Sequence, residues 1–172
     1  MKFKKTGLCF LFWAVIISYI IAVLLHFAYD FFGKPVLFAG LVPVSESVWE
    51  HLKLVFYPLC IIFLLPWCDN IHAVSFKNRI IITALAVIVG KFIVAMGHYG
   101  LKEGFSIEGI VSDLILLLVA FIVSIYHGMS IRTRRFPLWV LGVSCLYLLA
   151  DITLFYIFSF YPPDLPIFQP PL

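Results

Sequence analysis

The residues that could do chemistry are histidines and carboxylates near the ends of long apolar segments. His26, His51 and His98 each lie where such a segment begins or ends. Imidazole nitrogen is a common metal ligand, and a catalytic zinc ion typically takes three protein ligands and one water. The sequence therefore offers these three histidines as candidate ligands of a metal ion, with zinc as the candidate metal.

Two carboxylates and a hydroxyl group could supply the remaining chemistry. Glu50 directly precedes His51, and Asp113 lies in a later apolar segment. Either could be a further ligand or the base for a metal-bound water, whose pKa a zinc ion lowers to about 7. Ser47 lies four residues before His51, so its hydroxyl and the imidazole share one helix face. We take Glu50, Ser47 and Asp113 as candidate catalytic residues.

Four further charged residues lie in or beside the apolar segments. An unpaired charge at the bilayer centre costs about 2.5–3.5 kcal/mol, so such residues must pair, line water or bind a ligand. Glu46 and Lys53 flank the Glu50 position on the chain. Lys91 lies near the middle of its segment, and Asp151 lies in the outer half of the last one. We expect all four in one outward-facing polar pocket with the histidines.

The same residues also have purely structural interpretations. Ser47 and Glu50 have the spacing of a capping box, in which the serine caps the helix and the glutamate bonds back to it. Asp151 could form an ion pair with Lys53 or Lys91, and buried pairs of this kind persist with or without a function. Both interpretations stay open beside the functional one.

Membrane-spanning helices are the elements that must position these residues. Of 172 residues, 63% are hydrophobic and 12% are charged, and the mean hydropathy is +1.10. Soluble proteins average about 45–50% apolar and about 25% charged residues. The chain therefore has too little polar surface for a water-soluble globule. Its basic residues are scattered at segment ends, which is typical of membrane topology and argues against a nucleic-acid partner.

Five apolar stretches are long enough to cross a bilayer as helices, which takes about 20 residues. We expect them at about 7–29, 47–67, 79–99, 108–130 and 137–160. The short connections favour one compact bundle, so residues 1–172 are predicted to form a single all-α transmembrane domain. The apolar connection 30–46 is expected to be interfacial or re-entrant. The proline-rich tail 161–172 is expected to lie extended on the outer face.

The basic residues predict how the bundle is oriented, because cytoplasmic loops carry an excess of lysine and arginine. One side has two such residues, Lys34 and Lys102. The other side has eight: Lys2, Lys4, Lys5, Lys77, Arg79, Arg132, Arg134 and Arg135. The N-terminus is therefore predicted to be inside and the C-terminus outside, with the polar pocket facing outward.

Two motifs resemble a family of small bacterial membrane proteins, mostly from Gram-positive bacteria and of unknown function. They are Ser45-Glu-Ser-Val-Trp-Glu-His-Leu-Lys-Leu54 and Phe160-Tyr-Pro-Pro-Asp-Leu-Pro-Ile-Phe168. The resemblance covers essentially the whole chain and implies a five-helix protein of the bacterial cytoplasmic membrane. The family often has Asn where Ser45 stands and His where Asp164 stands, which leaves the tail's part in any site open.

Three functions remain open from the sequence. The first is a metal-dependent hydrolase or transferase that acts on a lipid or lipid-linked substrate. The spacing of Ser47 and His51 is similar to one element of the ceramidase and adiponectin-receptor superfamily, although this chain lacks their paired His-x-x-x-His and two of their seven helices. The second is a non-catalytic protein that binds a lipid head group, a peptide or a partner membrane protein. The third is a proton-coupled carrier with Lys91, Asp113 and Asp151 as titrating groups.

Overall fold

The computed structural model describes residues 2–65 and 74–170 of the chain. The long α-helices in these ranges are α1 (Lys2–Phe31), α2 (Val48–Leu64), α4 (Phe76–Tyr99), α5 (Ile110–Ile131) and α6 (Leu138–Phe160). Short 3₁₀ helices η1 (Val36–Phe38) and η3 (Pro166–Phe168) lie in the α1–α2 connection and the tail, and a π-helical turn η2 (Gly100–Gly104) follows α4. No strand occurs within the described ranges, which confirms the prediction of an all-α protein.

Within residues 2–65 and 74–170, four helical segments are long and apolar enough to cross a membrane. They are Gly7–Phe31, Phe76–Gly104, Ile110–Ile131 and Leu138–Phe160. α2 has 17 residues and ends at Leu64, three residues before the expected end. Leu65 turns to an extended backbone with ψ 145°, because it directly precedes a proline, and that neighbour disfavours helical geometry. The chain is thus a multi-pass membrane protein, while the fifth span and the orientation stay predictions.

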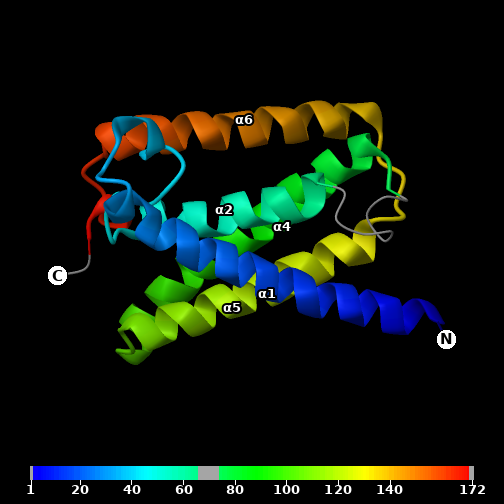
Figure 1. The fold of residues 1–172 in the computed structure, drawn as a ribbon, viewed down its shortest axis with the longest axis horizontal. Helices are drawn as coiled ribbons and strands as arrows, with labels where there is room; N and C mark the ends of the chain where they lie inside the picture. Colours follow the sequence, from blue (N-terminus) through cyan, green and yellow to red (C-terminus); the bar gives the residue numbers. More distant parts are fainter. Residues whose placement is uncertain (1, 66–73, 171–172) are drawn as a thin grey trace.

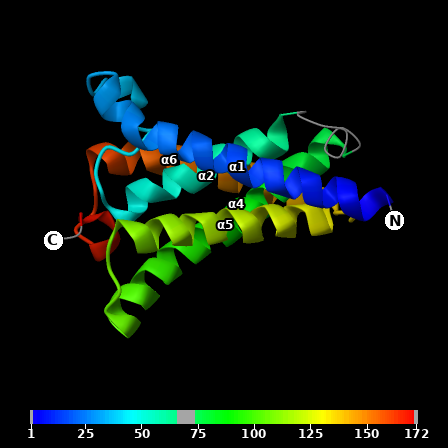
Figure 2. The same ribbon diagram turned by 60° about the horizontal axis from the view of Figure 1, so that its bottom comes forward.

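The helices are arranged around α4, which packs against α2, α5 and α6, while α1 packs against α2 and α5. Figure 1 shows α5 and α6 on opposite sides of the α2–α4 pair. At one end of the bundle the C-terminal end of α1, the start of α2, the α4–α5 junction and the tail gather together (Figures 1 and 2, left). We call this the polar end, because it carries most of the candidate site residues.

Apolar side chains fill the centre of the bundle and also cover its outside. The fully buried ones come from several helices and include Val55, Leu59, Val87, Phe121 and Ile125. Outward-facing residues such as Phe92 and Leu146 are 65% and 70% exposed, which suits a surface in contact with lipid. Hydrophobic side chains on both sides of a helix are the expected pattern for membrane spans.

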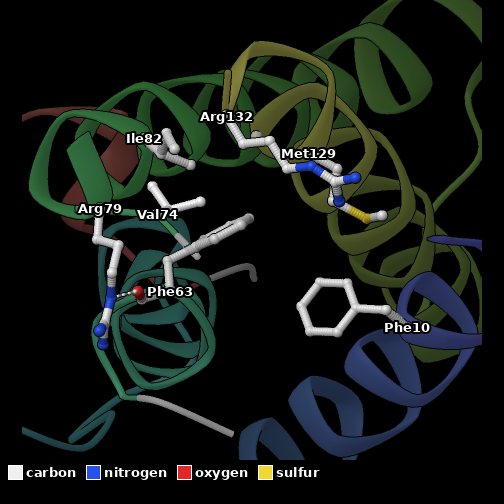
Figure 3. A pocket seen from close by; sticks show the side chains of 8 residues that line it. Phe10, Phe63, Val74, Arg79, Ile82, Met129 and Arg132 are labelled. Carbon is white, nitrogen blue, oxygen red and sulfur yellow. Dashed lines mark hydrogen bonds between the residues drawn. The ribbon is translucent and has the colours of Figure 1, made fainter. Parts of the chain in front are cut away.

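A small cavity lies at the end of the bundle opposite the polar end, and Arg79 is one of the residues that line it (Figure 3). The cavity has a volume of about 10 Å³, which is room for one water molecule. Arg79 lines it and donates a hydrogen bond from Nε to the carbonyl oxygen of Phe63 at 3.0 Å. This bond satisfies one of the last carbonyl groups of α2, which have no partner inside the helix.

We predict that Gly128→Ala destabilises the bundle and that Gly142→Ala does not. A Cβ atom on Gly128 would lie 2.5 Å from Phe63 Cζ in the core, whereas nothing lies within 4 Å of one on Gly142. Overpacking of this kind costs about 1–3 kcal/mol. Thermal unfolding in a maltoside detergent, followed by circular dichroism, measures the difference. Equal melting temperatures for the two variants would contradict the close packing of α2 on α5.

Candidate metal centre

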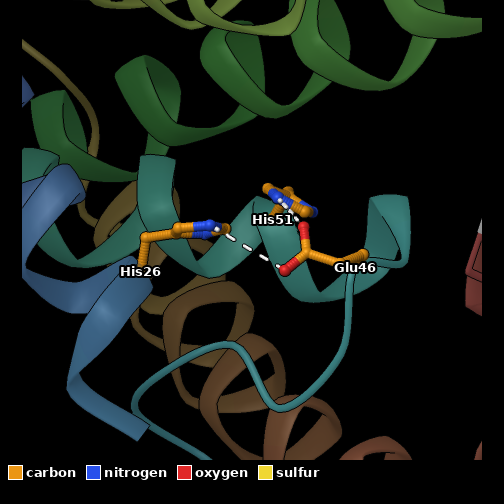
Figure 4. Close-up of side chains that lie close together, drawn as sticks. All are labelled: His26, Glu46 and His51. Atoms are coloured by element: carbon orange, nitrogen blue, oxygen red, sulfur yellow. Dashed lines mark ion pairs between the residues drawn. The ribbon is translucent and has the colours of Figure 1, made fainter. Parts of the chain in front are cut away.

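His26, Glu46 and His51 lie together at the polar end, with both imidazoles turned toward the carboxylate (Figure 4). His26 comes from α1, Glu46 from the α1–α2 connection, and His51 from the first turns of α2. One nitrogen or oxygen atom of each residue lies within 4.8 Å of the corresponding atoms of the other two. The structure thus joins two of the proposed histidine ligands with Glu46, which the sequence placed among the further pocket residues.

One of the two distances from Glu46 to the imidazoles equals the spacing of ligands around a tetrahedral metal ion, and the other is longer. Glu46 Oε2 lies 3.4 Å from His51 Nε2, and Glu46 Oε1 lies 3.8 Å from His26 Nε2. Zinc–nitrogen bonds of about 2.0–2.1 Å place neighbouring ligand atoms about 3.3–3.4 Å apart at the tetrahedral angle. Hydrogen bonds between nitrogen and oxygen are shorter, at about 2.7–3.2 Å. Both contacts are ion pairs when the imidazoles are protonated, and the three groups are also close enough together to share one metal ion.

The ring of His51 is held in the orientation of a metal ligand. Its Nδ1 lies 2.9 Å from the carbonyl oxygen of Ser47. A carbonyl oxygen can only accept, so in the neutral imidazole Nδ1 carries the proton and Nε2, which faces Glu46, carries a free lone pair. Histidines that bind metals almost always donate their second ring N–H to a carbonyl or carboxylate in this way.

His26 is the third member of the cluster, which is partly exposed to solvent. Its ring lies beside that of His51, with ring centroids 5.3 Å apart. The Nδ1 atom of His26 is buried and has no hydrogen-bond partner among the described residues. The side chains of His26, His51 and Glu46 are 25%, 29% and 66% exposed. An ion can therefore reach the three ligand atoms, and a fourth coordination position remains for water or a substrate.

Glu50 and Lys53 lie away from this cluster, in a buried ion pair. The Nζ–Oε2 distance is 2.5 Å, and the two residues are 2% and 0% exposed. Ser159 of α6 donates from its hydroxyl to Glu50 Oε1 at 3.0 Å and accepts from Lys53 Nζ at 2.6 Å. The structure thus pairs Glu50 with Lys53 and Ser159 and does not join it to the two histidines, because a buried lysine three residues away on the same helix requires an opposite charge.

Ser47 caps α2, as the structural interpretation of the sequence expected. Its backbone is extended and its hydroxyl accepts from the backbone N–H of Glu50 at 3.3 Å. The carboxylate of Glu50 does not return to Ser47. It accepts from the backbone N–H of Val44 at 2.8 Å and is also bound by Lys53 and Ser159. The capping box is therefore half formed, and the carbonyl oxygen of Ser47 binds the ring of His51.

His98 and Asp113 form a separate pair. His98 Nδ1 lies 3.1 Å from Asp113 Oδ1, where α4 ends and α5 begins. His98 lines a groove of about 360 Å³ between this junction and the tail, which the cluster residues do not line. Its other lining residues are Val48, Tyr99, Lys102, Glu103, Asp164, Leu165, Pro166, Gln169 and Pro170. The structure therefore does not bring His98 or Asp113 to the other two histidines.

Lys91 and Asp151 form a fourth group, which joins α4 to α6 at an Nζ–Oδ1 distance of 2.6 Å. The aromatic rings of Trp49, Tyr147 and Phe155 lie 5.2–5.9 Å from the Lys91 ammonium, which adds cation–π attraction. The expected single pocket is thus divided into separate groups. The physical reason is that each charge in the apolar interior pairs with its nearest opposite charge.

Sequence reasoning missed Ser159, Tyr57 and Tyr156 as polar partners of the α1–α2 connection. Tyr57 donates to the carbonyl oxygen of Gly40 and Tyr156 to that of Leu37, each at 2.6 Å. Ser159 lies 106 residues from Lys53 in the sequence, so no local spacing connects them. The one sequence feature that pointed to these residues was a hydroxyl group in an otherwise apolar helix, which needs a hydrogen-bond partner.

We predict that Ser47→Ala destabilises the protein by about 1 kcal/mol, because loss of an N-cap oxygen costs about 0.5–2 kcal/mol. The change should leave the His51 ring in place, since its acceptor is the backbone carbonyl of residue 47. Ser47→Asn keeps a capping oxygen and should retain most of the stability. Thermal unfolding in detergent compares the three proteins. An asparagine variant as unstable as the alanine variant would show that the cap is not the cause.

Comparison with known proteins places the chain in a family. The full chain, residues 1–172, matches a family described as "Family of unknown function (DUF6512)". No curated protein and no solved structure matches the chain. The family match covers every element that contributes to the cluster of His26, Glu46 and His51 and to the buried ion pairs. The chain therefore belongs to the DUF6512 family, whose function is unknown.

Proposed function

We propose that this protein is a metal-dependent hydrolase or transferase that acts on a lipid or lipid-linked substrate. The observation that carries the proposal is the convergence of His26, Glu46 and His51, with three potential ligand atoms within 4.8 Å of one another. Two imidazoles and one carboxylate are the donor set of one class of catalytic zinc site. A zinc ion held there would supply a water with a pKa of about 7 and a Lewis acid for a carbonyl or phosphoryl oxygen.

In this proposal His26, Glu46 and His51 would bind the zinc ion, and the contacts of each residue would orient it. His51 would bind through Nε2, because the Ser47 carbonyl oxygen holds its Nδ1 proton. His26 would bind through Nε2, the atom that faces Glu46. Glu46 would add a negative charge that offsets part of the charge of the ion. Three ligands from the protein leave one position at which water and a substrate oxygen could exchange.

A lipid-like substrate is supported by the surroundings of His26 on α1. Leu24, Phe27 and Phe31 on the same part of this helix are 66%, 64% and 82% exposed. Exposed apolar side chains at the end of a membrane span are expected to contact acyl chains. An amphiphile in the bilayer could therefore reach the cluster along α1 with its polar group toward the ion. The excess of basic residues at the opposite end supports an outward-facing site in the bacterial cytoplasmic membrane.

A non-catalytic binding protein is the alternative, and two observations favour it. Glu50 is engaged by Lys53, Ser159 and the backbone of Val44, so it is not free to act as a base beside the ion. The groove of about 360 Å³ at the α4–α5 junction is large enough for a lipid head group. The residues proposed for a carrier are divided between the Lys91–Asp151 and His98–Asp113 pairs, which gives that function less support.

We predict that the purified protein binds about one zinc ion per chain. His51→Ala and Glu46→Gln should each weaken zinc affinity by more than about 100-fold, which exceeds the 10–100-fold typical of losing an outer-shell partner. His98→Ala is the matched control, since this histidine lies outside the cluster and should leave affinity unchanged. Metal analysis and a competition titration with a zinc chelator in maltoside detergent measure these values.

Turnover of a lipid substrate distinguishes the proposed enzyme from the alternative of a non-catalytic binding protein. Zinc-loaded protein in nanodiscs, incubated with a panel of ester- and phosphate-linked lipids, should convert at least one of them, and His51→Ala should abolish that conversion. Zinc binding without turnover of any lipid would favour the alternative. Equal zinc content in the wild type and in all three variants would contradict the proposed metal centre.

A further inference from the structure

Groups that do not touch the metal cluster hold the backbone of the segment that carries Glu46. This segment, residues 32–47, connects α1 to α2. Lys53 Nζ donates to the carbonyl oxygens of Ala39 at 2.6 Å and Val42 at 3.2 Å. Apart from His51, five side chains of α2 and α6 therefore lie within hydrogen-bonding distance of its backbone: Lys53, Glu50, Tyr57, Tyr156 and Ser159.

Lys53 is the centre of this arrangement. Its ammonium group has three N–H donors, and four acceptors surround it: two backbone carbonyls, the Glu50 carboxylate and the Ser159 hydroxyl. The side chain is 0% exposed, so water cannot replace any of these acceptors. One residue of α2 thereby fixes the connecting segment and α6 at the same point, and removing it would leave several buried polar groups unpaired.

The segment also lies in close contact with α6. A Cβ atom on Gly40 would lie 2.1 Å from the ring of Tyr156, so only glycine allows the backbone to approach this ring. The Ser159 hydroxyl, one turn further along α6, lies 2.9 Å from the Ala39 carbonyl oxygen, which is an alternative acceptor to Glu50 for its single proton. The position of the segment is therefore set by packing and hydrogen bonds together.

Only one or two residues separate Glu46 from the backbone positions that are held in place. Glu50 accepts from the N–H of Val44 at 2.8 Å, two residues before Glu46, and Ser47 begins α2 directly after it. The Glu46 side chain itself is 66% exposed, and it forms ion pairs with His26 and His51. Its carboxylate is therefore placed by the backbone on either side, and metal ligands must be placed to within about 0.2 Å.

We propose that Lys53 is a positioning residue for the metal centre, which it serves by fixing the segment that presents Glu46 to His26 and His51. The inference rests on the proposed metal centre and adds to it a dependence of metal affinity on a residue without a contact to the ion. Through Ser159 the same dependence extends to α6, which contributes no ligand.

Cobalt binding tests the inference, because Co²⁺ occupies zinc sites and its visible absorption reports coordination geometry. The full chain is titrated with CoCl₂ in maltoside detergent. Lys53→Met should weaken Co²⁺ affinity at least tenfold and change the absorption band. Lys91→Met is the matched control: it breaks an intramembrane ion pair with an Nζ–O distance of 2.6 Å, which joins α4 to α6 and not to residues 32–47. It should lower stability and retain the wild-type affinity and spectrum.

Two further variants separate positioning from loss of folding and from an uncompensated charge. Ser159→Ala removes the hydroxyl that links α6 to Lys53 and Glu50, and should weaken affinity about fivefold, the value of one hydrogen bond of about 1 kcal/mol. It keeps the inference testable if Lys53→Met does not fold. The double variant Lys53→Met/Glu50→Gln leaves no unpaired carboxylate, and its affinity should stay low because the anchor is still missing.

Each outcome of the titration has a definite meaning. Wild-type affinity in a folded Lys53→Met or in Ser159→Ala would overturn the positioning role while leaving the metal centre intact. An equal loss of affinity in Lys91→Met would also overturn it, because any destabilisation would then suffice. Failure of the wild-type chain to bind Co²⁺ or Zn²⁺ would overturn the proposed function, and the positioning role with it.

Discussion

A charge inside a membrane protein must find its partner within the protein, and the structure of this chain depends on how Lys53 meets that requirement. Its ammonium is surrounded by the Glu50 carboxylate, two backbone carbonyls and the hydroxyl of Ser159. Burying one ion costs several kcal/mol in a real protein, which only good geometry and further hydrogen bonds can offset. The α1–α2 connection supplies two of the acceptors, so the burial of Lys53 depends on the path of this connection.

The same constraint separates structural from candidate functional residues. Lys91 and Asp151 are paired and enclosed by aromatic rings, and Glu50 is fully engaged. His26, Glu46 and His51 differ, because they are partly open to solvent and two imidazoles share one carboxylate. The enclosed pairs stabilise the bundle. The partly exposed cluster is the group of side chains that an ion could reach.

The sequence predicted the helices better than the site, for a physical reason. Long apolar runs identify membrane helices because lipid offers no partner for a free backbone group. The cap by Ser47 was also visible, since capping depends on neighbours three residues apart. Ser159 could not be assigned to Lys53, because the chain path over 106 residues decides that contact. For the same reason the sequence placed Glu46 in a pocket with the histidines but not as the partner of His26 and His51, and it could not assign His98 to Asp113 alone.

X-ray absorption at the zinc edge of the purified, zinc-loaded chain tests the central claim most directly. The account predicts two imidazole nitrogens and oxygen ligands, one of them from a carboxylate, at about 2.0–2.1 Å from the ion. In Glu46→Gln the oxygen contribution should change while both imidazoles remain. A spectrum with three imidazoles, with a sulfur ligand, or with the full hydration shell of free zinc would contradict the cluster of His26, Glu46 and His51 as a metal centre.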